Sequence, residues 1–114
     1  MDELRELALA LPGTAEDIAC AGTAMEAHTV TAGGKAFLFH RSEDLRLKLR
    51  DSLPEATALA AAEPERYRVG AHGWVTVALA DADPPPVDLL ARWVEESFRL
   101  IASKKLVAQL STQD

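Results

Sequence analysis

The sequence has a single cysteine, no long apolar run and an acidic rather than basic start. Cys20 has no second cysteine to pair with, so an intrachain disulfide is excluded and a reducing compartment is favoured. The longest apolar run, 56–62, is mostly alanine and far shorter than the roughly 18 residues of a membrane span. Met1-Asp2-Glu3 also lacks the basic charge that opens a secretion signal. We therefore expect a cytoplasmic protein that does not enter a membrane.

Recognisable catalytic and metal-binding motifs are missing too. The sequence contains no phosphate-binding glycine loop, nucleophile elbow, paired-cysteine zinc site or zincin helix. His28, His40 and His72 are well separated, on two predicted hairpins and a turn, and they lack ligand spacing. No motif surrounds Cys20, so a small buried or loop residue is favoured over a nucleophile. The expectation is a protein that is not an enzyme and needs no cofactor or metal.

What the sequence does contain is the composition of one ordinary globular domain. It has 114 residues, 48% of them apolar and 26% charged, which suits a single domain over 1–114 that folds alone. The net charge is −6 and the pI about 5.0. That balance excludes a general nucleic-acid coating protein and leaves room for a local basic surface.

Hydrophobic periodicity predicts three helices and five strands in the order α-β-β-β-α-β-β-α. A capping-box pattern, Ser52 with Glu55, predicts the start of the second helix. Residues 14–22 are small and polar and are predicted to be a loop, with one short turn capped by Thr14 and Asp17. The tail at 104–114 is expected to extend the last helix or to fray. The predicted helices are 2–11, 53–63 and 87–103, and the predicted strands are 24–31, 35–41, 44–50, 66–69 and 73–79.

The segment 44–50 has the clearest strand alternation in the chain. Its leucines point one way and its cations the other. Short antiparallel strands between terminal helices predict a two-layer α+β sandwich, with the terminal helices on one sheet face and the other face open. The predicted sheet core is Leu47, Leu49, Val75, Val77 and Leu79. The facing stripe of the last helix is Val87, Leu90, Val94, Phe98 and Ile101.

Charge is divided unevenly between the predicted strands and helices. The segments 35–50 and 66–73 hold seven cations and two acids, a net charge of +5. The rest of the chain holds five cations and sixteen acids, a net charge of −11. An open sheet face that carries cations and one or two aromatic rings can contact phosphates and stack bases. The alternative is a sheet face kept soluble, and its edges guarded, by lysine and arginine.

Several short motifs resemble, in order and spacing, the MmcQ/YjbR family of small bacterial proteins. The resemblance runs from residue 4 to about residue 105, nearly the whole chain. The motifs are Leu11-Pro12-Gly13, Gly33-Gly34-Lys35 with Phe37, Leu47-Lys48-Leu49, the segment 70–77 that reads G-A-H-G-W-V-T-V, and the segment 96–102 that reads E-S-F-R-L-I-A.

The resemblance implies a fold related to the frataxin-like α/β sandwich and a DNA-binding protein with a double-wing arrangement of hairpins. Two departures stand out. Ala19-Cys20-Ala21-Gly22 replaces a proline-tryptophan-glycine stretch, which leaves the role of that loop open. Arg66-Tyr67-Arg68-Val69 replaces a proline-tyrosine pair and adds charge to its strand.

These observations lead to one favoured function and two alternatives. The favoured function is a non-enzymatic nucleic-acid-binding or regulatory accessory protein, with DNA bound weakly and largely without sequence preference through about four to six phosphate contacts. Trp74 would stack bases. The alternatives are a module that binds an acidic protein through the same face, and an iron-handling protein of frataxin type. The oligomeric state is left open, with a monomer favoured. The predicted interface is Lys35, Arg41, Arg46, Lys48, Arg50, Arg66, Arg68, His72 and Trp74.

The iron alternative depends on the acidic residues around the first helix and on analogy with the fold that the resemblance implies. Fold analogy alone does not carry function. Favourable charge at a helix N-terminus and a solvated helix face explain acids there without iron. The acids concerned are Asp2, Glu3, Glu6, Glu16 and Asp17.

Overall fold

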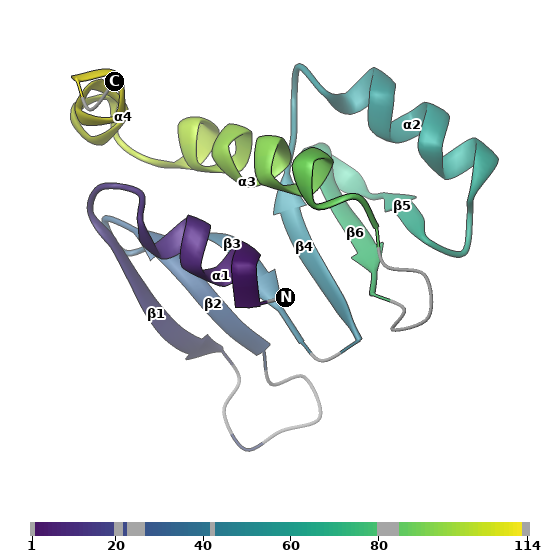
Figure 1. Cartoon of the computed structure of the whole chain (residues 1–114), viewed down its shortest axis with the longest axis horizontal. Coiled ribbons are helices and arrows are strands. Elements are labelled where there is room, and N and C mark those ends of the chain that lie inside the picture. Colours follow the sequence, from purple (N-terminus) through teal and green to yellow (C-terminus); the bar gives the residue numbers. More distant parts are fainter. Residues whose placement is uncertain (1, 20–21, 23–26, 42, 80–84, 113–114) are drawn as a thin grey trace.

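The protein is a two-layer α+β sandwich built on one six-stranded antiparallel sheet (Figure 1). A computed structural model describes residues 2–19, 22, 27–41, 43–79 and 85–112. The strands lie side by side in the order β1-β2-β3-β4-β6-β5. In chain order the elements are α1 (Asp2–Leu9), β1 (Thr14–Ala19), β2 (Ala27–Ala32), β3 (Lys35–His40), β4 (Asp44–Lys48), α2 (Leu53–Ala62), β5 (Tyr67–Val69), the 3-10 turn η1 (Ala71–Gly73), β6 (Trp74–Ala78), α3 (Val87–Ile101) and α4 (Lys104–Thr112).

Helices α1 and α3 cover one face of the sheet, as the alternation predicts (Figure 1). Leu4 and Ala8 of α1 are buried. Beneath the helices, the buried strand residues are Leu45, Leu47, Leu49, Val75 and Val77. Arg46 and Arg50 are exposed, so the cations of this segment do not point at the helices. We call the opposite side of the sheet the open face. Among the described residues, no helix is both long enough and apolar enough to cross a membrane.

Helix α3 packs on the sheet, on α1 and on the side of α2 and β5, and the predicted stripe does not account for the last of these contacts. Val94 and Phe98 are buried against the sheet, as expected, whereas Val87 is 43% exposed and Ile101 only partly buried. Trp93, absent from the predicted stripe, is fully buried. Its ring meets Tyr67 edge-on at 5.9 Å, and its Nε1 donates to Glu55 of α2 at 3.1 Å. A stripe aimed at the sheet misses Trp93 because this side chain turns sideways, toward α2 and β5.

The predicted loop at 14–22 is wrong, because Thr14–Ala19 is the edge strand β1. This segment is poor in the β-branched and aromatic residues that favour strands. It nevertheless pairs with all of β2, in a register that matches Thr14 with Ala32 and Ala19 with Ala27. Gly13, at φ +69°, turns the chain into it. An edge strand is paired on one side only, and the exposed side chains of β1 leave little hydrophobic alternation in its sequence. The prediction therefore missed β1, and the sheet has one strand more than predicted.

A bulge between β2 and β3 changes which residues share a face. Val30 lies opposite Leu38 and Thr31 opposite Ala36, so Phe37 is unpaired in the ladder. Phe37 and Leu38 are both buried, and Phe39 points to the open face. Ser97 of α3 stabilises the bulge, since its hydroxyl donates to the Phe37 carbonyl at 2.5 Å and accepts the Lys48 N–H at 2.9 Å.

The capping box predicted for α2 is also wrong. Ser52 is the N-cap residue, but its side chain makes no capping bond to the described helix backbone. Its hydroxyl donates instead to Glu96 of α3 at 2.6 Å, and Glu96 also accepts the N–H groups of Arg50 and Ser52. Burial works to raise the pKa of Glu96, but these hydrogen bonds hold it below its ordinary value of 4.5. Glu55, the predicted partner of Ser52, accepts a hydrogen bond from Trp93 instead. The turn that leads into α2 is therefore held by the Glu96 carboxylate of α3.

The tail forms a separate helix, α4, instead of extending α3. Leu106 lies against the turns that follow α1 and β2, where a Cβ on Gly13 would come within 2.5 Å of its Cδ2. The Leu106 N–H is accepted by the Ser103 hydroxyl at 3.3 Å. The tail thus packs through Leu106 on these two turns.

Candidate nucleic-acid interface

One residue from each strand forms a row across the open face. Directly opposed residues of an antiparallel pair point to the same side, so the strand registers define this row. Its charge changes from acidic on β1 to basic on β4 and β5. In spatial order the row is Asp17, Thr29, Phe39, Arg46, Thr76 and Arg68.

Two aromatic rings and an arginine meet near the middle of this face, and we call Phe39, Arg46 and Trp74 the aromatic–arginine cluster. The rings of Phe39 and Trp74 make an edge-to-face contact with centroids 5.6 Å apart. The guanidinium carbon of Arg46 lies 5.7 Å from the centroid of the Trp74 ring, a cation–π distance. Trp74 and Phe39 are partly exposed and Arg46 is exposed, so the cluster is open to a ligand.

Three cations on this face carry charge that no carboxylate neutralises within the described part of the chain. We call Arg46, Lys48 and Arg68 the basic strip. Lys48 lies opposite Trp74, and Thr76 separates Arg46 from Arg68 in the row. Arg46 and Arg68 are exposed and Lys48 is partly exposed. The strip therefore places unpaired positive charge within and beside the aromatic–arginine cluster, which favours phosphate binding.

Three other predicted interface cations are paired with acids. Arg41 makes a bidentate contact with Asp44, at 3.0 and 2.7 Å, and this partner raises the pKa of the guanidinium. Arg50 lies 3.6 Å from Asp51, where both side chains are highly exposed. Exposed pairs of this kind contribute little to stability, but they offset the charge that an incoming phosphate would meet.

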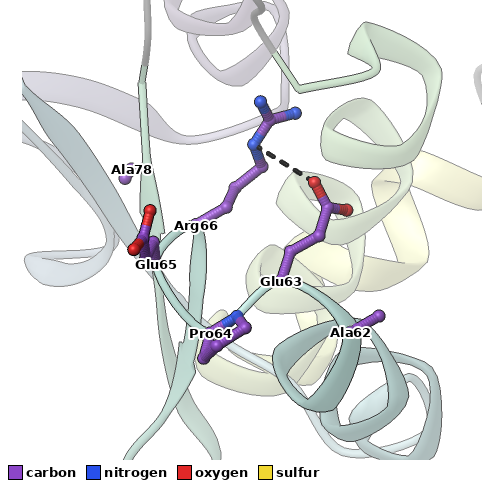
Figure 2. A pocket seen from close by; sticks show the side chains of 6 residues that line it. All are labelled: Ala62, Glu63, Pro64, Glu65, Arg66 and Ala78. Carbon is purple, nitrogen blue, oxygen red and sulfur yellow. Dashed lines mark ion pairs between the residues drawn. The ribbon is translucent and has the colours of Figure 1, made fainter.

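Arg66, the third, lies in a pocket beside the turn between α2 and β5 (Figure 2). Its side chain is only 17% exposed, and its Nε lies 3.7 Å from Glu63. Figure 2 shows the Glu63 carboxylate turned toward the guanidinium of Arg66. The pocket has a volume of about 480 Å³, and Glu65 also lines it. With two glutamates for one arginine, its lining does not attract a phosphate, and Arg66 is separate from the basic strip.

Lys35 and His72 lie toward the ends of the sheet. Lys35 is opposite the buried Ala32, and because of the bulge this register position belongs to the helix-covered side. His72 is exposed in η1, with φ +58°. The following residue, Gly73, accepts the Leu49 N–H at 2.8 Å, which places this turn beside the end of β4. The structure thus brings together four of the predicted interface residues, Arg46, Lys48, Arg68 and Trp74.

Phe39 belongs to the same site, but the interface predicted from the sequence does not include it. In the sequence it alternates with Phe37, which suggests that both rings share a face. The unpaired Phe37 breaks that alternation. No local sequence signal marks the bulge, because it depends on Ser97 of a distant helix.

Two histidines expected to be separate are neighbours on the helix-covered side. The rings of His28 and His40 stack with centroids 5.3 Å apart and planes 15° apart. Burial, and then the nearby His28, lowers the pKa of His40 below its ordinary value of 6.5. The buried Nε2 of His40 has no hydrogen-bond partner in the described structure.

The acidic residues proposed for iron binding are only partly described. Glu16 forms an ion pair with Arg5, and the hydrogen bond from Arg5 lowers the pKa of this carboxylate. The side chains of Asp2 and Glu3, and all of Cys20, lie outside the described residues. Within the described residues, no three histidine, cysteine, aspartate or glutamate side chains are grouped to hold a metal ion.

The fold and this face define a small α+β protein whose open sheet carries basic and aromatic side chains. The YjbR family model matches residues 9–100, most of the chain, so the protein belongs to the YjbR family. No curated protein and no solved structure matches the chain. Three residues of the motifs that resemble the family stabilise the fold. Gly73 accepts the Leu49 N–H at the end of β4, Glu96 binds the turn into α2, and Ser97 binds the bulge.

Proposed function

We propose that this protein is a non-enzymatic accessory protein that binds nucleic acid on the open face of its sheet. The observation that supports this proposal most strongly is the basic strip. Its three cations have no carboxylate partner in the described structure; Arg46 lies over the Trp74 ring, Lys48 is opposite Trp74, and Arg68 follows beyond Thr76. The strip contacts phosphates, and the acidic residues of α1 and β1 repel nucleic acid from those elements. A cytoplasmic location, favoured by the isolated cysteine, belongs to the same proposal.

Binding through this strip is weak, salt-dependent and largely independent of sequence. Three unpaired cations support fewer phosphate contacts than the four to six expected from the sequence. With three contacts, affinity should fall roughly 20- to 40-fold between about 50 and about 200 mM salt. The strip consists of strand residues, and among the described residues none of its cations belongs to a helix that could enter a major groove and read base edges.

Fluorescence anisotropy with a labelled oligonucleotide tests the proposal at the two salt concentrations. Replacing Arg46, Lys48 and Arg68 with serine should abolish binding without unfolding, because none of the three is fully buried. The matched control replaces Arg99, Lys104 and Lys105, three exposed helix cations, so that the net charge changes equally. Binding should survive in the control. If both variants lose binding equally, or the unmodified protein does not bind at the lower salt, the proposal fails and an acidic protein becomes the favoured partner.

A further inference from the structure

We propose that the aromatic–arginine cluster receives an unpaired base, so that the ligand of the open face is single-stranded nucleic acid rather than a duplex. The inference rests on the proposed function and adds the chemical class of the ligand. The basic strip alone would attract either form, since both present phosphates. The cluster distinguishes them, because only an unpaired base offers a free π-face for stacking.

The position of Arg46 shows how a base would enter. Its guanidinium lies over the Trp74 ring, where it occupies the place that a planar, electron-poor group prefers. Phe39 packs edge-on against the same ring and holds it in place. A base that replaces the guanidinium keeps a stacking contact with Trp74. The displaced Arg46 remains on the open face, within reach of the adjoining phosphate, so stacking and charge pairing occur together.

The extent of the site also suits a short single strand. The cluster and the basic strip span the strands from β3 to β5, which is three inter-strand steps or about 14 Å. Beyond β3 the open-face row ends in Thr29 and Asp17, and the exposed carboxylate of Asp17 disfavours a phosphate there. A rigid duplex laid across this row would meet the acidic end. A flexible strand can turn away after a few nucleotides.

The two tryptophans of the chain make a direct test possible. Trp74 is partly exposed on the open face, whereas Trp93 is fully buried and hydrogen-bonded to Glu55. Quenching of tryptophan fluorescence by acrylamide in the free protein should therefore come mainly from Trp74. Binding would be measured by anisotropy, and quenching recorded in parallel, with three ligands of equal length: a single-stranded oligonucleotide, an abasic strand and a duplex.

We expect the base-bearing single strand to protect Trp74 from acrylamide, and the abasic strand and the duplex to leave it accessible. Trp74→Leu should weaken single-strand binding by about 5- to 30-fold and change duplex binding by less than about twofold. Arg46→Lys keeps the charge and leaves both rings in place, so it is informative even if Trp74→Leu unfolds. It should widen the difference between single-strand and duplex binding, because an ammonium stacks on the Trp74 ring less well than a guanidinium and so competes less with the base.

Equal binding of the abasic and base-bearing strands, with Trp74 equally accessible in both complexes, would overturn the inference and leave the proposed function standing. An unchanged preference for single strands in both folded variants would overturn it as well. If no ligand binds at low salt, the proposed function and the inference fail together.

Discussion

At the scale of single residues, His40 makes the stability of the protein depend on pH. Its buried Nε2 has no partner in the described structure, and burial and His28 lower its pKa below 6.5. As the pH falls below about 6.5, the unfolded chain protonates this histidine more readily than the folded protein does. The free energy of unfolding should therefore decrease from pH 7 toward pH 5, and level off below the folded pKa. Thermal unfolding as a function of pH measures the slope, and NMR titration the pKa. His40→Gln should flatten the slope, and an unchanged slope in this variant would contradict this account.

Substitutions at Gly73 and Gly34 distinguish two destabilising effects of adding a Cβ atom, namely backbone strain at positive φ and a steric clash with a neighbouring strand. Both have positive φ, +83° and +87°, but a Cβ on Gly73 would lie 2.3 Å from the Leu49 carbonyl oxygen, whereas nothing lies within 4 Å at Gly34. Gly34→Ala should cost about 1–2 kcal/mol, from backbone strain alone. Gly73→Ala should cost at least about 1 kcal/mol more, because the end of β4 must also move. Urea denaturation measures the free energy of unfolding of both variants. Equal losses would contradict this prediction, because they would mean that the end of β4 moves away from the new Cβ atom without a cost in free energy.

At the scale of elements, Glu96 joins α3 to the turn that leads into α2. Its carboxylate accepts three hydrogen bonds from Arg50 and Ser52. Glu96→Gln should lower the free energy of unfolding by about 1–3 kcal/mol, because an amide supplies only one acceptor oxygen for these donors. Glu95→Gln is the matched control and should cost less than about 0.5 kcal/mol. Within the described residues, the one polar contact of the Glu95 side chain is an exposed ion pair with Arg99 at 3.9 Å. Chemical denaturation of the two variants checks the difference, and equal losses would mean that the Glu96 contacts do not hold this turn.

The helices and strands also show how much of the fold could be predicted from the sequence. Helix α3 and strands β4 and β6 were predicted because each buries one face, and burial imposes a regular alternation on the sequence. The edge strand β1 exposes most of its side chains, so it carries no such pattern. The bulge at Phe37 and the Glu96 contacts depend on residues 44 to 60 positions apart. Local patterns do not contain that information.

At the scale of the whole molecule, positive charge collects on β4 and β5 of the open face, whereas α1 and β1 are acidic. The predicted division into basic strands and acidic helices is only partly observed, because β1 is an acidic strand and α4 carries two lysines and no acid. Four of the predicted interface residues gather on the basic part of the open face: Arg46, Lys48, Arg68 and Trp74. The sequence did not predict that Arg41 and Arg66 would pair with Asp44 and Glu63, because ion pairs form between side chains whose separation only the fold determines. The structure therefore reduces a broad basic region to a compact strip beside the aromatic–arginine cluster.

The most direct test of the central claim is an NMR titration of the isotopically labelled protein with a short single-stranded oligonucleotide at low salt. The account predicts backbone shifts confined to β3, β4, β5 and β6 around Phe39, Arg46, Lys48 and Arg68. The indole resonance of Trp74 should move, while that of the buried Trp93 stays fixed. Shifts centred on α1 and α3, or no shifts while the protein remains folded, would contradict it.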